Sequence, residues 1–474
     1  MPFLKSILVL LLALCAFAEP GVFENTSVIK TVDLSEAVVK VTLRIQVHVL
    51  EGSPKEYYVA IPKSEAEHMA VILPSSSNKL AISVKKAEIQ DREDVVLYVL
   101  SCKTGIEDKS LLFVDYYLTH VLVSLPAFVS QKDTAKYTFT QTLFVQSPYP
   151  SAKQEIRFKL PSRELESATQ LNPFSQRDDT LIYGPFTSLP AYAPSEVVTI
   201  HFPSIAHFIT FDRVEREIEV SHWGNVAVEE VIRARNSGTP LQGEFSRLDY
   251  YRSDPDAISA WEELKGRIDK RASGVYYRDI IGNVTTSHVR RERDTVVVEL
   301  AMRFPMLGGW KNEFYWGYNL PSGRVLKKEG SRYSLSVPFA SPLEKADTQE
   351  LVVRVILPEY ARNVHFVLPE GVTGPTEDHR FTYLDTSREG RPVFEFTQHN
   401  VVDEQKGEMI TVSYELSGWR VMKKPLVCVG AFFVLFAVKA VVNALRKVKR
   451  DWRVCLHGVY VRDDGSRRHR NSLS

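Results

Sequence analysis

The chain has 474 residues, of which 44% are hydrophobic, and its 59 Lys and Arg nearly balance its 58 Asp and Glu, for a formal net charge of +1. This balance gives no reason to expect a specific nucleic-acid partner. Only four cysteines are present, so the chain must rely on large hydrophobic cores rather than on a disulfide framework.

The N-terminal segment has the pattern of a secretory signal peptide. Lys5 precedes an apolar run over residues 7–17, and this run, too short to span a bilayer, reaches the small-residue cleavage pattern Ala16-Phe17-Ala18. We therefore predict that residues 1–18 are removed and that the mature chain begins near Glu19, inside the secretory pathway.

A second apolar segment, residues 426–445, predicts one transmembrane helix, because at about 1.5 Å per residue it covers the roughly 30 Å hydrocarbon core. Lys439 and Asn443 interrupt it. They are candidates for polar contacts with a neighbouring membrane helix, although both side chains could instead reach the headgroups. More basic residues follow the segment than precede it, so the tail 446–474, with a net charge of +6, is predicted to be cytosolic.

The predicted lumenal part, residues 19–425, carries a net charge of −7. Its single cysteine, Cys102, has no lumenal partner within the chain, and a buried apolar role is favoured over a reactive thiol. Two sequons fall in this part, Asn25-Thr26-Ser27 and Asn283-Val284-Thr285, and both are predicted N-glycosylation sites because the compartment is a glycosylating one.

The lumenal part is predicted to be mainly β. Apolar and polar residues alternate with the period of a strand in four segments, 40–50, 295–300, 351–358 and 409–416.

An internal repeat indicates two domains. Val32-x-Leu34-Ser35 recurs as Ile218-x-Val220-Ser221 at an offset of 186 residues, and each copy is followed by a turn at the same offset. We expect two tandem, sandwich-like β-rich domains, residues 19–210 and 211–425, each within the size range of single all-β domains.

One helix is predicted inside the second domain. Asp254 can cap it, Pro255 suits its first turn, and the apolar residues Ala257, Ile258, Trp261, Leu264 and Ile268 recur at helical spacing. Asp254-Pro255-Asp256 also matches the Asp-x-Asp pattern with which many sugar-nucleotide transferases hold a divalent metal. Capping is the favoured interpretation, and a membrane-anchored transferase that uses these two carboxylates is the alternative.

Motifs of other enzyme classes are absent from the sequence. It contains no phosphate-binding loop, no His-Glu-x-x-His, no Cys-x-x-Cys pair and no Gly-x-Ser-x-Gly, and its twelve histidines lack metal-like spacing. We therefore predict no catalytic residues, no cofactor and no bound metal.

Several longer motifs resemble the ribophorin I family, the type I membrane subunit 1 of the endoplasmic reticulum oligosaccharyltransferase. These motifs are SHWGN (221–225), GEFSRLDYYR (243–252), VYYRDIIGNVTTSH (275–288), RFPMLGGWKNEFYWGYNLP (303–321), LPEGV (368–372), FTYLDT (381–386) and GRPVFEF (390–396). The resemblance covers nearly all of residues 19–445 and is most specific over 211–321.

The resemblance implies a non-catalytic subunit of the complex that transfers an oligosaccharide en bloc from dolichyl diphosphate to Asn of Asn-x-Ser/Thr. The implied partners are the catalytic and other subunits, nascent polypeptides, the translocon and the endoplasmic reticulum membrane. Animal members continue into a long cytosolic region, whereas only 29 residues follow the predicted span here. A ribosome-docking role of that region is therefore not carried over.

The aromatic stretch 303–321 allows two interpretations. A core strand, with Phe314, Trp316 and Tyr318 on one face, is favoured. The alternative is a surface for an acceptor peptide, a sugar or a neighbouring subunit, formed by Trp310 and Trp316. That alternative would also suit an independent lumenal lectin or a chaperone-like cargo-binding membrane protein.

Overall fold

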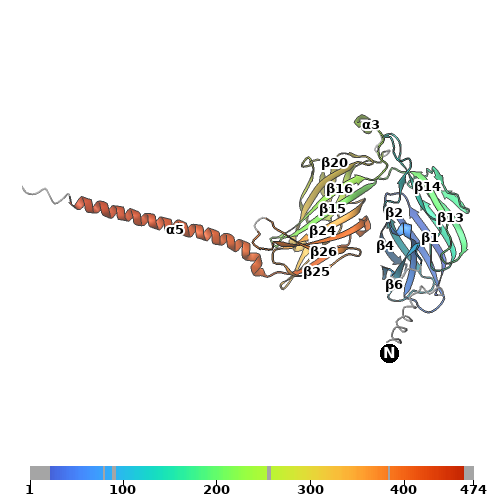
Figure 1. Cartoon of the computed structure of the whole chain (residues 1–474), viewed down its shortest axis with the longest axis horizontal. Helices are drawn as coiled ribbons and strands as arrows, with labels where there is room; N and C mark the ends of the chain where they lie inside the picture. Colours follow the sequence, from blue (N-terminus) through green and yellow to red (C-terminus); the bar gives the residue numbers. More distant parts are fainter. Residues whose placement is uncertain (1–21, 78–80, 88–91, 253–257, 383–384, 464–474) are drawn as a thin grey trace, which may run out of the picture.

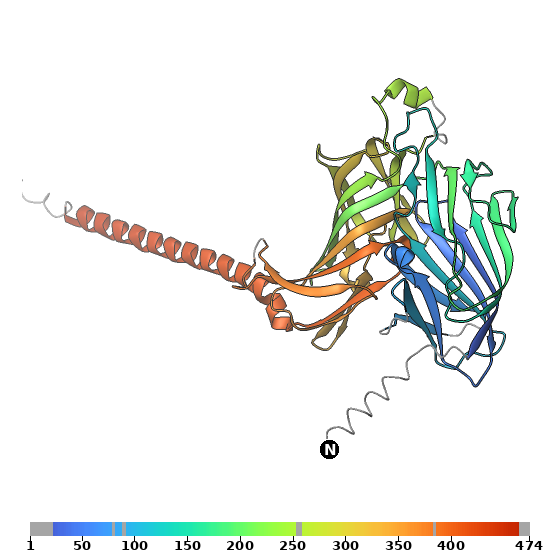
Figure 2. The same cartoon turned by 45° about the vertical axis from the view of Figure 1, so that its right-hand side comes forward.

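The computed structural model describes residues 22–77, 81–87, 92–252, 258–382 and 385–463. Two β-rich domains lie side by side, and one long helix, α5 (Gly418–Asp463), projects from the second domain (Figures 1 and 2). The predicted fold class, mainly β in two tandem domains with one apolar C-terminal helix, is confirmed.

A large mixed sheet organises the first domain. In the described residues its strand order is β12 (Phe174–Arg177), β13 (Thr180–Leu189), β10 (Ser151–Lys159), β1 (Phe23–Asp33), β2 (Val39–Val49), β7 (Leu111–Leu118) and β4 (Met69–Ser76). β1 pairs parallel with β10 and antiparallel with β2. Two smaller sheets pack in the same domain, β11 (Ser167–Ala168), β14 (Val197–Pro203), β9 (Lys136–Thr142) and β8 (Val123–Ser124) in one, and β3 (Glu56–Pro62), β6 (Val95–Cys102) and β5 (Ile82–Lys86) in the other. The short helix α2 (Lys63–Ala66) follows β3.

The second domain repeats this plan. The strand order of its large sheet in the described residues is β18 (Ser273–Asp279), β21 (Lys311–Pro321), β16 (Asn225–Asn236), β15 (Ile209–Val220), β24 (Ala346–Ile356), β27 (Arg391–Val401) and β26 (Thr373–Arg380). The smaller sheets are β17 (Trp261–Asp269), β20 (Thr295–Met306) and β19 (His288–Arg291), and β22 (Leu326–Glu329), β23 (Arg332–Pro338), β28 (Met409–Glu415) and β25 (Arg362–Val367). The remaining elements are α3 (Arg247–Arg252), α4 (Ser322–Val325) and the 3₁₀ helix η3 (Asp403–Gln405).

The two large sheets have the same topology. β15 stands where β1 stands, since each pairs antiparallel with the next strand and parallel with a strand much later in the domain, β24 or β10. The repeat in the sequence therefore corresponds to a repeated sheet. Each domain also has its own core, and the cores divide between Phe208 of the first and Ile209 of the second.

Each core contains a buried cation beside a tyrosine and a glutamate. In the first domain Lys30 of β1 lies 3.1 Å from the Glu65 carboxylate, which also accepts a hydrogen bond from the Tyr116 hydroxyl at 2.7 Å. In the second domain Arg216 of β15 pairs with Glu230 of β16, and its guanidinium also donates to the Tyr318 hydroxyl at 3.3 Å.

The helix predicted after Asp254 is wrong. Residues 253–257, which include Asp254, Pro255, Asp256 and Ala257, lie outside the described residues, and Trp261–Asp269 is strand β17, paired with β20. Leu264, Gly266 and Ile268 are buried at strand spacing, and a register shift between Trp261 and Glu263 also turns Trp261 inward. The helical spacing of the apolar residues thus arose from a glycine and a β-bulge within a strand.

The aromatic stretch 303–321 forms the end of β20, a turn and β21. Phe314, Trp316 and Tyr318 are buried in the core, as the core-strand interpretation requires. The turn contains Gly308, and a Cβ atom there would lie 1.9 Å from the Thr239 carbonyl oxygen, so the close approach requires glycine.

Among the described residues, one helical segment is long and apolar enough to cross a membrane. It covers Gly418–Arg450 within α5; the most apolar window of 18 residues in it has a mean hydropathy of 2.4, and none of that window is buried. The predicted span 426–445 lies inside this segment.

Candidate functional site

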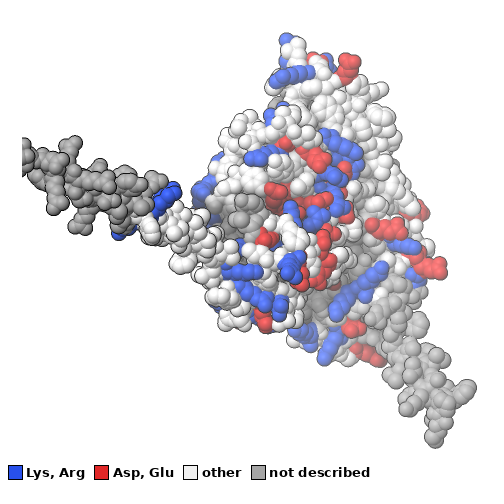
Figure 3. All heavy atoms as spheres, turned by 60° about the vertical axis from the view of Figure 1, so that its left-hand side comes forward, with Lys and Arg blue, Asp and Glu red and all other residues white. Residues whose placement is uncertain are grey.

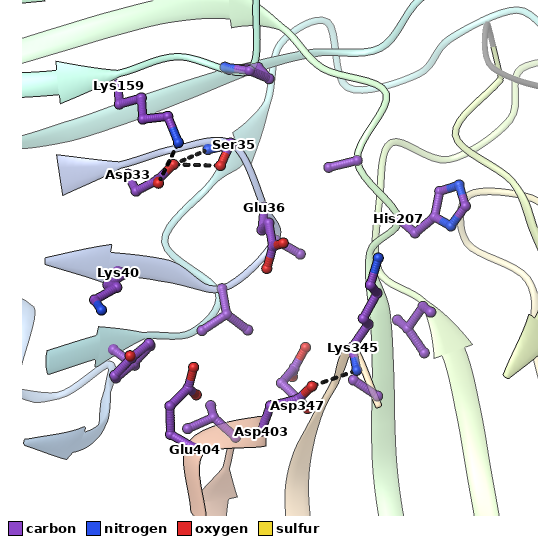
Figure 4. A pocket seen from close by; sticks show the side chains of 18 of the residues that line it. Asp33, Ser35, Glu36, Lys40, Lys159, His207, Lys345, Asp347, Asp403 and Glu404 are labelled. Atoms are coloured by element: carbon purple, nitrogen blue, oxygen red, sulfur yellow. Dashed lines mark hydrogen bonds and ion pairs between the residues drawn. The ribbon is translucent and has the colours of Figure 1, made fainter. Parts of the chain in front are cut away.

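A cleft of about 690 Å³ lies between the two domains (Figure 4). The first domain lines it with the loop after β1, with Tyr117 of β7 and with the end of β10. The second lines it with the starts of β15 and β24 and with the segment after β27, and the linker 205–207 joins the two sides. The site is therefore built from segments that are distant in sequence and that meet only because the domains pack side by side.

The charged groups of the first wall are held in place. The Asp33 carboxylate accepts hydrogen bonds from the Ser35 N–H at 3.0 Å and from the Lys159 ammonium at 3.0 Å. Burial raises the pKa of Asp33, but the Ser35 hydroxyl, the Ser35 N–H and Lys159 outweigh this effect, so the net pKa lies below the ordinary value. Asp33 is thus a fixed anion at neutral pH.

The second wall carries carboxylates tied to both domains. Asp347, at the start of β24, accepts a hydrogen bond from the Thr210 hydroxyl at 3.0 Å, and its other oxygen lies 3.1 Å from Nε2 of His120 in the first domain. Asp403 accepts the Lys345 N–H at 2.7 Å. Burial is the main cause that raises the pKa of the neighbouring Glu404.

A second set of contacts joins the domains outside the lining of the cleft. The Tyr137 hydroxyl accepts the Thr239 N–H of the second domain at 3.1 Å, and within the first domain the Tyr137 ring is held by stacking on Phe208, with centroids 4.5 Å apart. Gln131 of the first domain makes two hydrogen bonds to the backbone of Ser246 in the second, at 2.8 and 2.9 Å. Backbone and side-chain bonds together thus join the domains outside the linker.

The cleft offers binding chemistry of mixed kind. Glu36 and Lys345 stand on opposite walls (Figure 4), and Val38, Pro161 and the 45% exposed Ile205 supply apolar surface. An extended polypeptide presents this same mixture of charged groups, backbone amides and apolar side chains. Within the part of the chain that the structure describes, no group of three or more His, Cys, Asp or Glu is arranged to hold a metal ion.

The outer surface carries both signs of charge side by side. In the view of Figure 3, blue and red side chains are interspersed over the face of the molecule. On the outer face of the second large sheet, Arg354 pairs with Glu215 and with Glu395, each at 2.7 Å.

A second polar cluster lies where α5 leaves the second domain. The Lys424 ammonium lies 2.8 Å from Asp385 and 3.0 Å from Glu359, and the Lys423 ammonium donates to the Tyr360 hydroxyl at 2.6 Å. The Arg420 guanidinium lies 5.0 Å from the centre of the Tyr360 ring. The first turns of the apolar helix are therefore fastened to the domain.

The sequence matches the family described as Ribophorin I over residues 23–443. The chain belongs to the ribophorin I family. This result confirms the family named from the motifs, and the matched region contains both β-rich domains and most of the apolar segment of α5.

Curated relatives align with most of this chain. The subunit 1 of dolichyl-diphosphooligosaccharide–protein glycosyltransferase from Caenorhabditis elegans is 34% identical over 89% of this chain and 72% of its own length. Subunit 1A from Arabidopsis thaliana is 32% identical over 91% of this chain and 72% of its own. Among solved structures, native yeast LTA4 hydrolase has a TM-score of 0.27 at 9% identity, over 38% of this chain and 29% of that chain, which carries no argument about function.

The structure places the two sequons of this ribophorin I family member differently. Asn25 lies in β1 and is 1% exposed; its Nδ2 donates to Ser147 Oγ at 3.0 Å, and its Oδ1 accepts from the Tyr57 hydroxyl at 2.8 Å. A glycan on Nδ2 would require β1 to leave the core, so the prediction that Asn25 is glycosylated does not fit the folded protein. Asn283 is exposed at the end of a turn after β18.

The remaining predicted site residues lie apart from the cleft. Trp316 is fully buried, and its Nε1 donates to Glu230 at 2.8 Å, so its ring has no free face for a sugar or a peptide. Trp310 is partly buried between Phe245 and Phe304. Lys439 and Asn443 are four residues apart on α5, hence on the same side of that helix.

Sequence reasoning did not find the residues of the cleft or of the α5 junction. Glu36, Lys345 and Asp347 belong to no motif and are ordinary loop or strand-end residues in the sequence. In the sequence Lys423 and Lys424 are only charges that flank the apolar segment. The two carboxylate partners of Lys424 lie about 40 and 65 residues earlier, and the hydroxyl partner of Lys423 lies 63 residues earlier.

Proposed function

We propose that this chain is a non-catalytic subunit of an oligosaccharyltransferase, the complex that transfers oligosaccharide from dolichyl diphosphate to Asn of Asn-x-Ser/Thr. The match to the ribophorin I family over residues 23–443 carries the proposal. Relatives from the nematode and the plant are named as subunit 1 of that glycosyltransferase. The partners of this chain are then the catalytic and other subunits, nascent polypeptides and the translocon.

The proposal places both domains in the lumen of the endoplasmic reticulum and the tail in the cytosol. An apolar segment within α5 and the basic cluster after residue 445 support this orientation. Trp223 and Trp419, which are 63% and 73% exposed, lie near the start of α5, at the level where aromatic side chains contact headgroups. The fastened start of α5 would then hold the second domain close to the bilayer.

The cleft between the domains is proposed to hold an extended part of the acceptor polypeptide near the catalytic subunit. Its charged walls and apolar patches support binding, and its carboxylates are committed to partners such as Lys159, Thr210 and the Lys345 N–H. These contacts position the side chains for recognition rather than for proton transfer.

Complex membership is tested by a native pull-down. The chain is tagged at its C-terminus, microsomes are extracted in mild detergent, and co-purifying proteins are identified by mass spectrometry. The eluate is assayed for transfer of lipid-linked oligosaccharide to an Asn-x-Thr peptide. A stoichiometric multi-spanning partner with activity is expected, whereas a lone and inactive chain would overturn the proposal in favour of an independent cargo-binding protein.

Acceptor binding in the cleft is tested by photo-cross-linking within the purified complex. A photoreactive side chain replaces Glu36 on the cleft wall, and a matched probe replaces Lys311, which is exposed on the outer face of β21. Cross-links to a translocating acceptor chain are expected from position 36 and not from position 311. Equal yields at both positions would show that the cleft is not the binding surface.

A further inference from the structure

Four side chains form one row across the edge of the second large sheet. Val231 of β16 pairs with Tyr315 of β21, Tyr315 pairs with Arg278 of β18, and Arg278 forms an isolated antiparallel bridge with Asn283. Side chains of directly opposed residues point to the same face of a sheet. The side chain of the exposed sequon residue Asn283 is therefore directed to the outer face, toward Arg278 and Tyr315.

The next row of the same face extends this surface. Glu229, Gly317 and Tyr276 are cross-strand neighbours, and the Tyr276 ring lies over Gly317, where a Cβ atom would be only 2.6 Å from the ring carbon that carries the hydroxyl. The Tyr276 hydroxyl donates to the Glu229 carboxylate. A tyrosine is thereby held flat on the sheet because the residue beneath it has no side chain.

Together these side chains line an open hollow of about 520 Å³ on the outer face, formed by Glu229, Val231, Tyr276, Arg278 and Tyr315. The two tyrosine rings meet edge to face with centroids 6.4 Å apart, and Arg278 donates to the Tyr315 hydroxyl at 3.4 Å. Partly exposed rings bordered by a guanidinium and a carboxylate are the groups that bind the apolar faces and the hydroxyls of a sugar.

The backbone at Asn283 is held firmly toward this surface. Asp279 and Gly282 exchange backbone hydrogen bonds at 3.1 Å and close a tight turn between Arg278 and Asn283. Arg303 of β20 pairs with Asp279 and also donates to the Asn283 carbonyl oxygen at 3.1 Å. A sugar attached to Asn283 would therefore start from a fixed point and in a fixed direction.

We propose that the N-glycan on Asn283 folds back over this hollow, so that Tyr276, Tyr315 and Arg278 bind its N-acetylglucosamine core. The distance suits this ligand, because Tyr315 lies two strand spacings from Asn283, roughly 10 Å, about the reach of two linked sugars. The occupant is the chain's own oligosaccharide, attached at one end of the hollow. When bound, it covers the outer face of the sheet beside the edge strand β18.

The inference rests on the lumenal orientation in the proposed function, and endoglycosidase protection tests it. The full-length glycosylated protein, in mild detergent with its associated subunits, is treated with an endoglycosidase that cleaves between the two core N-acetylglucosamines. Cleavage at Asn283 is followed by mass spectrometry in the native and in the denatured state. Native wild type is expected to be cleaved about tenfold more slowly than native Tyr315→Ala, the factor for one lost stacking contact.

Matched variants separate docking from general stability. Arg278→Ala is expected to speed native cleavage as Tyr315→Ala does, while Tyr315→Phe, which keeps the ring, should behave as wild type. Lys311→Ala, four residues from Tyr315 on the outer face of β21, is the control and should not change the rate. Denatured rates should be equal for all variants, and thermal unfolding of each variant shows whether the domain is intact.

Two results would overturn the inference in distinguishable ways. A folded chain without a glycan on Asn283 would remove both the ligand and the support for a lumenal orientation. A glycosylated chain whose native cleavage rate is the same in wild type and in Tyr315→Ala would refute docking alone, and would leave complex membership untouched.

Discussion

Lys30 of β1 and Arg216 of β15 occupy equivalent positions in the two domains, 186 residues apart, and each carries a positive charge into a hydrophobic core. Tyr116 and Tyr318 also occupy equivalent positions. In the first domain Tyr116 pairs with the residue that pairs with Val32, and in the second domain Tyr318 pairs with the residue that pairs with Ile218. The glutamates differ in origin, because Glu65 comes from α2 and Glu230 from β16. The buried cation at the equivalent position is thus neutralised in each domain by a glutamate from a different element.

Removing one member of the buried pair should destabilise the second domain strongly. Arg216→Met leaves Glu230 buried without its cation, and the expected loss in the free energy of unfolding is about 3–5 kcal/mol. Arg213 lies on the same strand as Arg216, and Arg213→Met breaks partly exposed pairs with Glu215 and with Glu350 of β24. It should cost about 1 kcal/mol or less. Denaturant unfolding measures both variants, and equal losses would contradict a special role of the buried pair.

Gly308→Ala should disturb both the turn before β21 and the domain contact beside it. The added Cβ atom meets the carbonyl of Thr239, whose N–H bonds to Tyr137 of the first domain, so we expect a loss of about 1–3 kcal/mol. Gly323→Ala is the matched control, since a Cβ atom there meets nothing within 4 Å. Thermal unfolding and limited proteolysis of the linker should change for position 308 only; unchanged unfolding there would refute the close contact.

The two sequons should differ in occupancy. We expect Asn283→Gln to remove the glycan from the folded protein and to increase its mobility on a gel, because Asn283 is exposed. Asn25→Gln should leave glycosylation of the folded protein unchanged, since the Asn25 side chain is buried, accepts a hydrogen bond from Tyr57 and donates one to Ser147. Site-resolved mass spectrometry of the folded protein gives the answer, and a glycan on Asn25 of folded molecules would contradict the placement of β1.

The attachment of α5 to the second domain should depend on acid pH. Burial raises the pKa of Asp385. Hydrogen bonds from Lys424 and Thr382 and the charge of Arg391 lower it by more, so that the net pKa is about 2. A folded-state pKa below the ordinary 3.8 contributes stability that is complete above about pH 4 and is lost as the pH falls toward 2.

Hydrogen exchange of the backbone amides of residues 417–424, corrected for the intrinsic effect of pH, should therefore stay constant from pH 8 to about 5 and rise below 4. Asp385→Asn should raise this exchange at neutral pH and remove the acid step. Glu377→Gln, on the exposed strand β26, is the control. An acid step that persists in Asp385→Asn would assign it to another group.

Local patterns in the sequence predicted local structure well where one strand face is buried. All but the last residue of the predicted strands 40–50 and 409–416 lie in β2 and β28, because alternation there reflects burial on one side only. The helix predicted from Trp261, Leu264 and Ile268 was wrong because a β-bulge and Gly266 give the apolar residues of this strand the spacing of a helix.

Features that depend on distant segments could not be predicted. Asn25 and Asn283 belong to equally good sequons, and only the pairing of β1 with β10 buries the first of them beside Ser147 and Ser151. The cleft has the same origin, since loops from both domains meet there through tertiary packing. Sequence patterns reflect the neighbours of a residue along the chain, whereas the burial of Asn25 and the lining of the cleft depend on segments that are distant in sequence.

Because β1 and β10 are far apart in the sequence, the large sheet of the first domain can form only after a delay during translation. Asn25 cannot be enclosed until Ser151 has been made, 126 residues later, and at about 5–20 residues per second this takes roughly 6–25 s of translation. In the proposed lumenal orientation, the sequon at Asn25 is accessible to an oligosaccharyltransferase during that interval. An oligosaccharide added then would keep β1 out of its sheet, so strand pairing would compete in time with glycosylation.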